Sequence, residues 1–263
     1  MTVCDVEQAL AQIAPPSLKI GPDPIGRSIG SKSTQVTGIA IALDATVRVM
    51  DAAIGAHCNV IITHHPLIYT PLLSLDPDGG FPQAAAVHAV KHGLTIISAH
   101  TNWDCAHGGI NDTLASLLNI VDTEPIEDVR LFGTTATGLG RIGRLETPIP
   151  ETEYVLLVDT ILGIHTRRSE ERTRLITSVA LCGGAGASLY PAIKHKADLF
   201  MTGDVRHHEF VMSYGEGCTI WDIGHRESES PGTKELGIRL ADGLLCDVHW
   251  VDALGRTSRI YRD

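Results

Sequence analysis

The stretch Ile61-Ile62-Thr63-His64-His65-Pro66 decides the expected fold, because an apolar run ends there in two adjacent histidines. Neighbouring side chains on a strand point to opposite faces, so both histidines can serve one compact site only if the strand has already ended. Pro66 supports this end, since it biases His65 toward extended geometry and offers no backbone N–H group. A pair of imidazoles splayed in this way suits two metal ions better than one.

Apolar runs alternate with helical patterns on both sides of this stretch. In the first half of the chain we expect strands at residues 36–43, 59–63 and 94–98. Helices are expected between them at about residues 46–56 and 83–92. Asp44 is interpreted as the cap of the first helix. Strand-helix-strand-helix-strand is the pattern of a parallel sheet.

The second half of the chain repeats this alternation. The expected strands are residues 175–181, 199–202, 219–223 and 244–251. The expected helices are residues 151–162, a segment ending near 196, and about 206–214 and 234–241. Residues 126–150, rich in Gly, Thr and Pro, are interpreted as a linker between a first lobe at 1–125 and a second at 151–263. The predicted fold class is α/β, with two lobes on mostly parallel sheets and a metal site in the cleft between them.

Composition excludes several classes of protein. The chain of 263 residues has 43% hydrophobic residues, 31 acidic and 21 basic side chains, and a formal charge of −10. This charge repels phosphate backbones, so nucleic acid is an unlikely partner. No apolar run is long enough for a membrane span and the amino terminus does not resemble a secretory signal, so we expect a cytoplasmic protein. The six scattered cysteines form no C-x-x-C pair and are interpreted as buried, reduced thiols.

Polar side chains follow the carboxyl ends of several predicted strands. His64, His65, Asp104, Asp204 and His225 all fall there. Ligands bind at this edge of open α/β sheets, so we expect residues of both lobes to converge. Imidazole with carboxylate suits zinc, iron or manganese, and two such ions could activate a hydroxide as nucleophile.

Each of these signals also has a simpler explanation. Histidines at strand ends often bond the backbone, and a His-x-x-x-Glu spacing such as His225 to Glu229 often marks an exposed helix pair. Asp204 is either a partner that orients a ligand histidine or a helix cap. His207 and His208 are further candidates for orienting ligands, and His100 and His208 for moving protons.

A glycine-rich turn, residues 183–188, lies between a predicted strand and helix. Gly184, Gly186 and Ser188 are candidates for binding an anionic substrate through backbone N–H groups. The turn lacks the lysine of a P-loop. Tight packing of helix on strand is the alternative explanation for the glycines.

Seven segments of the chain, in order, resemble the NIF-three-like dinuclear metal-centre family, whose members are named GTP cyclohydrolase 1 type 2 homologues. The likeness extends from about residue 36 to 240. The segments are Ala42-Leu43-Asp44-Ala45-Thr46, Ile62-Thr63-His64-His65-Pro66-Leu67, Ala99-His100-Thr101-Asn102-Trp103-Asp104, Gly138-Leu139-Gly140-Arg141, Cys182-Gly183-Gly184-Ala185-Gly186, Thr202-Gly203-Asp204-Val205-Arg206-His207-His208 and residues 224–229.

The resemblance implies two divalent metal ions and toroidal hexamers. Its implied metal ligands are His64, His65, Asp104, His225 and Glu229. The chain departs from the family at residues 20–27, where relatives carry a Trp-Asp-Asn-x-Gly-Leu stretch, so this part of the site is expected to be remodelled. Arg226 stands where an aromatic residue is common and is a candidate for binding substrate phosphate or carboxylate.

These observations support two hypotheses about function. The first is a dinuclear-metal-dependent hydrolase, similar to GTP cyclohydrolase 1 type 2, that uses a metal-activated hydroxide on a nucleotide-like or phosphorylated heterocyclic small molecule. The second is a non-catalytic metal-binding scaffold that forms an oligomeric ring and regulates protein partners.

Overall fold

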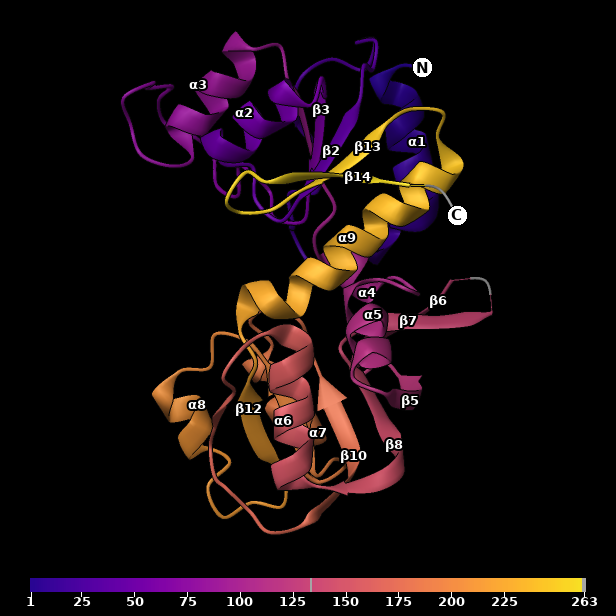
Figure 1. Cartoon of the computed structure of the whole chain (residues 1–263), viewed down its shortest axis with the longest axis vertical. Coiled ribbons are helices and arrows are strands. Elements are labelled where there is room, and N and C mark those ends of the chain that lie inside the picture. The colour runs from indigo at the N-terminus through magenta and orange to yellow at the C-terminus, as the bar shows by residue number, and fades with distance from the viewer. Residues whose placement is uncertain (133, 262–263) are drawn as a thin grey trace. The chain divides into compact units, whose positions relative to one another are not determined.

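The structure is a computed structural model that describes residues 1–132 and 134–261. Two compact units divide the chain, Met1–Trp103 with Thr233–Asp263 as the first and Asp104–Gly232 as the second (Figure 1). These bounds differ from the predicted lobes. The end of the chain belongs to the first unit, and residues 104–125 belong to the second.

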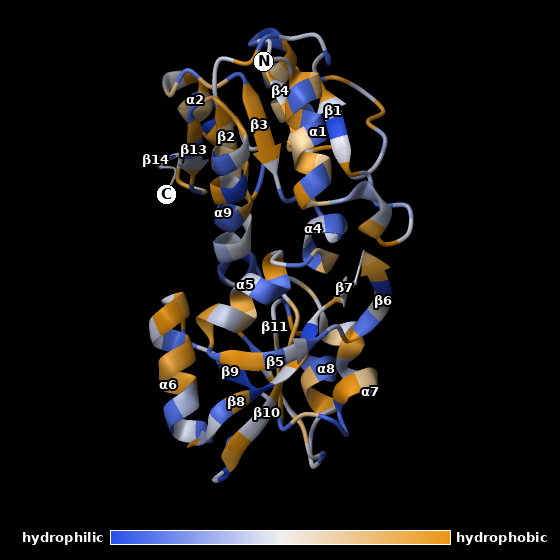
Figure 2. Ribbon diagram, turned by 90° about the vertical axis from the view of Figure 1, so that its right-hand side faces the viewer, coloured by the Kyte–Doolittle hydropathy of each residue, from blue (hydrophilic) through white to orange (hydrophobic). Residues whose placement is uncertain are grey.

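A six-stranded sheet forms the centre of the first unit, in the order β1-β4-β3-β2-β13-β14. Its strands are β1 (Gly26–Ile29), β2 (Ile39–Ala42), β3 (Val60–Thr63), β4 (Thr95–Ser98), β13 (Val248–Val251) and β14 (Thr257–Ile260). The four inner strands are parallel, and β1 and β14 pair antiparallel at the edges. β2, β3 and β4 are buried along their whole length, as expected for strands covered on both faces. Figure 2 shows β3 as an almost wholly hydrophobic strand.

The helices of the first unit include the two predicted between its central strands. They are α1 (Val3–Ile13), η1 (Pro16–Leu18), α2 (Val47–Gly55) and α3 (Gln83–Lys91). Met50 of α2, Ala86 of α3 and Ile61 of β3 belong to one buried core. The predicted cap of α2 was wrong by two residues, because Thr46 Oγ1 accepts the Val49 N–H at 3.2 Å. Asp44 is instead bonded to a histidine, as described below.

A second six-stranded sheet, in the order β5-β8-β10-β11-β12-β9, forms the centre of the second unit. Its strands are β5 (Ile120–Glu124), β8 (Arg141–Pro150), β9 (Arg167–Arg168), β10 (Leu175–Leu181), β11 (Leu199–Thr202) and β12 (Thr219–Asp222). β10, β11 and β12 are parallel, as predicted, whereas β5, β8 and β9 join them antiparallel.

The predicted linker at residues 126–150 is not a loop. It contains the hairpin β6 (Glu127–Phe132) and β7 (Thr135–Leu139) as well as all of β8. Glycine, threonine and proline there suggested a connection, but threonine favours strands, and a Pro at the end of β8 removes no inner hydrogen bond. β9 likewise lies outside the strands expected from the sequence.

The other seven helices among the described residues either lie in the second unit or contain residues of both units. Those within the second unit are α5 (Ile110–Leu117), α6 (Glu151–Leu162), η2 (Ala187–Leu189), α7 (Tyr190–Ile193) and α8 (His207–Val211). The other two, α4 (Thr101–Cys105) and α9 (His225–Gly243), contain residues of both units. α9 begins nine residues before the predicted start at 234. The prediction placed the start too late because Pro231 and Gly232 resemble helix breakers in the sequence. Gly232 is needed here, since a Cβ would come within 2.5 Å of Ile110 Cα.

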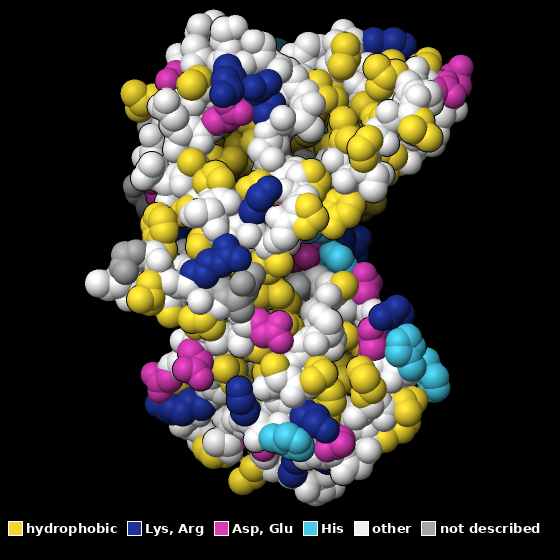
Figure 3. All heavy atoms as spheres, turned by 180° about the vertical axis from the view of Figure 1, so that it is seen from behind, with side chains coloured by type: hydrophobic (Ala, Val, Ile, Leu, Met, Phe, Trp, Pro, Cys, Tyr) yellow, Lys and Arg dark blue, Asp and Glu magenta, His cyan; other side chains and the backbone are white. Residues whose placement is uncertain are grey.

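Hydropathy and charge of the surface agree with the composition. No helix among the described residues is long and apolar enough to cross a membrane. On the face shown in Figure 3, basic and acidic side chains are interspersed and form no broad basic patch.

The cap of α2 can be tested by stability measurements. Thr46→Ala removes the oxygen that accepts the Val49 N–H, and we expect it to lower the free energy of unfolding by about 1 kcal/mol. Thr46→Ser keeps an acceptor and should retain most of this stability. Urea denaturation would measure both variants, and equal losses for the two would contradict the assigned cap.

Candidate metal centre

Three imidazoles form a cluster within the first unit. His64 and His65 follow β3, and His100 follows the neighbouring parallel strand β4, so the ends of both strands meet at one edge of the sheet. The ring centroid of His64 lies 5.1 Å from that of His65 and 5.1 Å from that of His100. The centroids of His65 and His100 are 5.7 Å apart. One ligand atom of each residue lies within 4.8 Å of the others, a spacing that could hold a metal ion.

Each ring of this cluster is held through Nδ1 by an oxygen atom. His64 Nδ1 lies 3.0 Å from Ala99 O, His65 Nδ1 lies 2.8 Å from Asp44 Oδ1, and His100 Nδ1 lies 2.9 Å from Asp23 Oδ1. Because these oxygens accept, Nδ1 of each neutral ring carries the proton and Nε2 keeps its lone pair. This is the arrangement that orients histidine ligands of metals.

Asp23, like Asp44, is a hydrogen-bond partner that sequence reasoning missed. Its side chain is buried, and besides His100 it accepts bonds from the Thr101 N–H at 3.0 Å and the Thr101 hydroxyl at 2.5 Å. Burial acts to raise the pKa of Asp23, but the hydrogen bonds from His100 and Thr101 outweigh it and lower the pKa below its ordinary value. Asp23 lies in the segment expected to be remodelled, and a proline on each side of it was the available signal.

Within the second unit, an imidazole and carboxylates lie close together. His225 and Glu229 occupy the first turn of α9, one above the other, with His225 Nε2 3.1 Å from Glu229 Oε2. His225 Nδ1 lies 2.7 Å from Asp204 Oδ2, the contact that the predicted role of Asp204 in orienting a ligand histidine requires. The alternative role as a helix cap is wrong, because Arg206 is the cap of α8.

Asp104 lies in the same neighbourhood of the second unit as Glu229. Both are buried. Burial first, and then the negative charges of Asp104 and Glu229, raise the pKa of the Cys182 thiol well above its ordinary value. A raised pKa disfavours the thiolate, which is the form of cysteine that binds metal.

Two glycines make room for this group. A Cβ on Gly184 would lie 2.1 Å from Glu229 Oε1 and 3.3 Å from His225 Nε2, and the φ of Gly184 is +65°. A Cβ on Gly203 would lie 2.6 Å from the His225 backbone nitrogen. Only glycine lets the loop after β10 and the end of β11 come so close to α9.

The same loop does not offer its amides to an anion. The Gly184 N–H donates to Ser228 Oγ at 3.0 Å, and the Gly186 N–H donates to Thr202 Oγ1 at 2.8 Å. Both amides are used inside the protein, which argues against the anion-binding role predicted for these glycines and favours the packing explanation. Ser188 is exposed in the short helix η2.

Three other predicted residues lie on the surface. Arg226 is exposed and its guanidinium is bonded to Glu227 Oε1. His208 is exposed on α8, and the groups of potential ligands among the described residues do not include it. His207 is exposed on the same helix. The structure therefore gives these three residues no contact that supports their predicted roles.

Imidazole nitrogens with carboxylate oxygens are a donor set for zinc, iron, manganese or cobalt. An α/β protein of two units with such groups at strand ends is the class that fold and site define. A family model described as Duf34/NIF3 (NGG1p interacting factor 3) matches residues 1–252. The chain belongs to this family.

Individual relatives agree with this assignment. A Clostridium perfringens protein named GTP cyclohydrolase 1 type 2 homolog is 32% identical over 259 residues, which cover 95% of each chain. NGG1-interacting factor 3 of Saccharomyces cerevisiae is 28% identical over 73% of this chain and 71% of its own. The crystal structure of a Staphylococcus aureus hypothetical protein has a TM-score of 0.85 at 26% identity, covering 95% of this chain and 96% of that one.

The position of Glu229 depends on Gly184, and this dependence can be tested. In Gly184→Ala the added methyl group collides with the carboxylate, so we expect divalent-metal binding to fall at least tenfold. Gly163→Ala is the matched control, because Gly163 has nearly the same φ of +67° with nothing within 4 Å of an added Cβ. It should cost about 1 to 2 kcal/mol of stability and leave metal binding intact. Elemental analysis and equilibrium dialysis would measure binding, and equal metal affinity in both variants would contradict the account.

Proposed function

We propose that the protein is a dinuclear-metal-dependent hydrolase of a nucleotide-like or phosphorylated heterocyclic small molecule. The proposed ligands are His64, His65, Asp104, His225 and Glu229. The observation that carries the proposal is that Nδ1 of each proposed ligand histidine is held by an oxygen atom, the contact that orients histidine ligands of metals, with Nε2 of His225 facing the carboxylate of Glu229.

The chain itself keeps parts of the two groups close. Asp104 follows His100 by four residues, so their Cα atoms can be at most about 14 Å apart whatever the arrangement of the units. Asp104 and Glu229 in turn lie near the same thiol within the second unit. Our proposal is that the imidazole cluster and the carboxylates hold two divalent transition-metal ions, zinc, iron or manganese.

Each residue has a defined task in this proposal. Bound metal would supply Lewis acidity and lower the pKa of a coordinated water toward about 7. Asp44 and Asp204 hold the rings of His65 and His225, and the Ala99 carbonyl holds that of His64. His100, fixed by Asp23, is proposed to move the proton during hydrolysis.

The substrate class rests on the names of relatives and on charge. The Clostridium perfringens relative carries the name of a GTP cyclohydrolase homolog. The net charge of −10 argues against long nucleic acids and leaves a small molecule as the better substrate.

Turnover by the purified protein tests this function. Metal-loaded protein is incubated with GTP, other nucleotides and phosphorylated heterocycles, and the products are separated by chromatography. We expect His64→Ala to abolish a product that the parent forms. His165→Ala is the control, because the side chain of His165 is fully exposed outside the cluster, and it should leave product formation unchanged.

A scaffold role is the second candidate, favoured by the yeast relative, whose name describes a partner interaction. In this case the metals stabilise the fold, and the oligomeric ring implied by the family resemblance presents a surface to other proteins. Absence of turnover across the whole panel, together with a lower melting temperature of His64→Ala, would favour this role over hydrolysis.

Mutation of His100 tests whether this residue is a metal ligand or a proton carrier. His100→Gln should retain both metal ions and lower the turnover of the substrate found in the panel by about 10²- to 10⁴-fold. Asp23→Asn should reduce turnover less, because the ring of His100 remains. Loss of one metal equivalent from His100→Gln would instead make His100 a ligand.

A further inference from the structure

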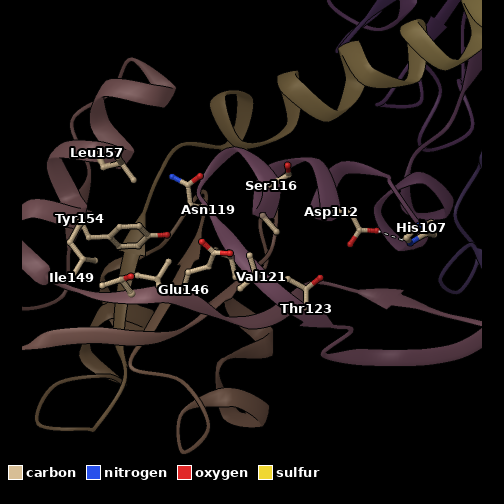
Figure 4. A pocket seen from close by; sticks show the side chains of 14 residues that line it. His107, Asp112, Ser116, Asn119, Val121, Thr123, Glu146, Ile149, Tyr154 and Leu157 are labelled. Atoms are coloured by element: carbon tan, nitrogen blue, oxygen red, sulfur yellow. Dashed lines mark ion pairs between the residues drawn. The ribbon is translucent and has the colours of Figure 1, made fainter.

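A hollow of about 670 Å³ lies within the second unit, apart from the candidate ligands. Residues of α5, β5, β8 and α6 line it, together with residues adjoining these elements (Figure 4). Its volume is in the range of pockets that bind small organic molecules. None of its lining residues belongs to the proposed metal centre.

The floor of this hollow is apolar. Ala115, Ile120, Leu145 and Tyr154 line it and are buried. The Tyr154 hydroxyl donates to Leu118 O at 3.0 Å, so the polar end of this side chain is satisfied, and its ring packs in the core beneath the hollow. Such a floor favours a ligand with a flat or aliphatic apolar body.

The charged side chains that line the hollow determine which ligand charge it favours. Glu146 and Asp112 are the carboxylates of the lining, and no Lys or Arg stands among the described residues that form it. Asp112 is already committed, since it accepts bonds from buried Arg141 and from the Gly108 N–H at 2.6 Å. Glu146 is exposed and has no ion pair or hydrogen bond among the described residues.

Polar groups surround Glu146 without neutralising it. Figure 4 shows Asn119, Glu146 and Tyr154 reaching into the same space. Ser116, Thr123 and Thr147 add hydroxyl groups to the lining. An anion would meet one uncompensated carboxylate here, whereas a cation would gain a charge-assisted hydrogen bond and further acceptors.

We infer that this hollow is a binding site for an amphipathic organic cation, with an ammonium group at Glu146 and an apolar body on the floor around Tyr154. This site is independent of the proposed hydrolase activity. The recognised class is a primary or secondary amine attached to an aromatic or branched aliphatic group.

Calorimetric titration of the metal-loaded protein with three matched probes tests this assignment. The probes are 2-(1-naphthyl)ethylamine, 2-(1-naphthyl)ethanol and 1-naphthylacetate, which share one body and differ in charge. We expect the amine to bind with a dissociation constant of about 1 mM or tighter, the alcohol about tenfold more weakly, and the carboxylate not at all. No binding of the amine, or equal binding of the carboxylate, would overturn the inference.

Variants place the binding in this hollow. Glu146→Gln should weaken the amine by about tenfold and leave the alcohol unchanged, whereas Glu153→Gln, an exposed carboxylate of α6 outside the lining, should alter neither. Ser116→Trp should fill the hollow and block both probes. His64→Ala should bind the amine like the parent, which separates this site from the metal centre. An amine affinity that Glu146→Gln leaves unchanged would refute the assignment.

Discussion

The hydrogen bond from a histidine Nδ1 to a fixed oxygen is the interaction on which the candidate centre depends. It fixes which ring nitrogen carries the proton, orients each ring and makes Nε2 the nitrogen that would bind a metal ion. His65, His100 and His225 each use an aspartate as the oxygen, and His64 uses a backbone carbonyl. These contacts hold the rings in the orientation that a metal ligand needs.

The sheet explains why these partners can be assembled from distant parts of the chain. Parallel strands end at one edge, so a residue just after β3 lies beside a residue just after β4 although 35 or more positions separate them. Small residues complete the arrangement in the second unit, where Gly184 and Gly203 let backbone approach α9 within distances that a Cβ would forbid. Fold and site are thus consequences of the same packing.

Sequence reasoning predicted the parts of the molecule that repeat a strong local pattern. The buried runs of β2, β3, β4, β10, β11 and β12 carry such a pattern, and so does α6. It missed β6, β7 and β8, which are partly exposed and polar, and it missed the first turns of α9 because proline and glycine obscure them. His64, His65, Asp104 and His225 were singled out by their places after predicted strands, and Glu229 by its spacing to His225. Asp23 and Asp44 were not expected as partners, because a hydrogen-bond partner is defined by tertiary contact and leaves no spacing in the sequence.

The most direct test of the central claim is anomalous diffraction from crystals of protein purified without chelators, recorded at the absorption edge of the bound metal. The account predicts two peaks, with the Nε2 atoms of His64, His65 and His225 about 2.1 Å from a metal ion, and with every Nδ1 still bonded to its oxygen. Metal bound through Nδ1, or no metal at these histidines after loading, would contradict it.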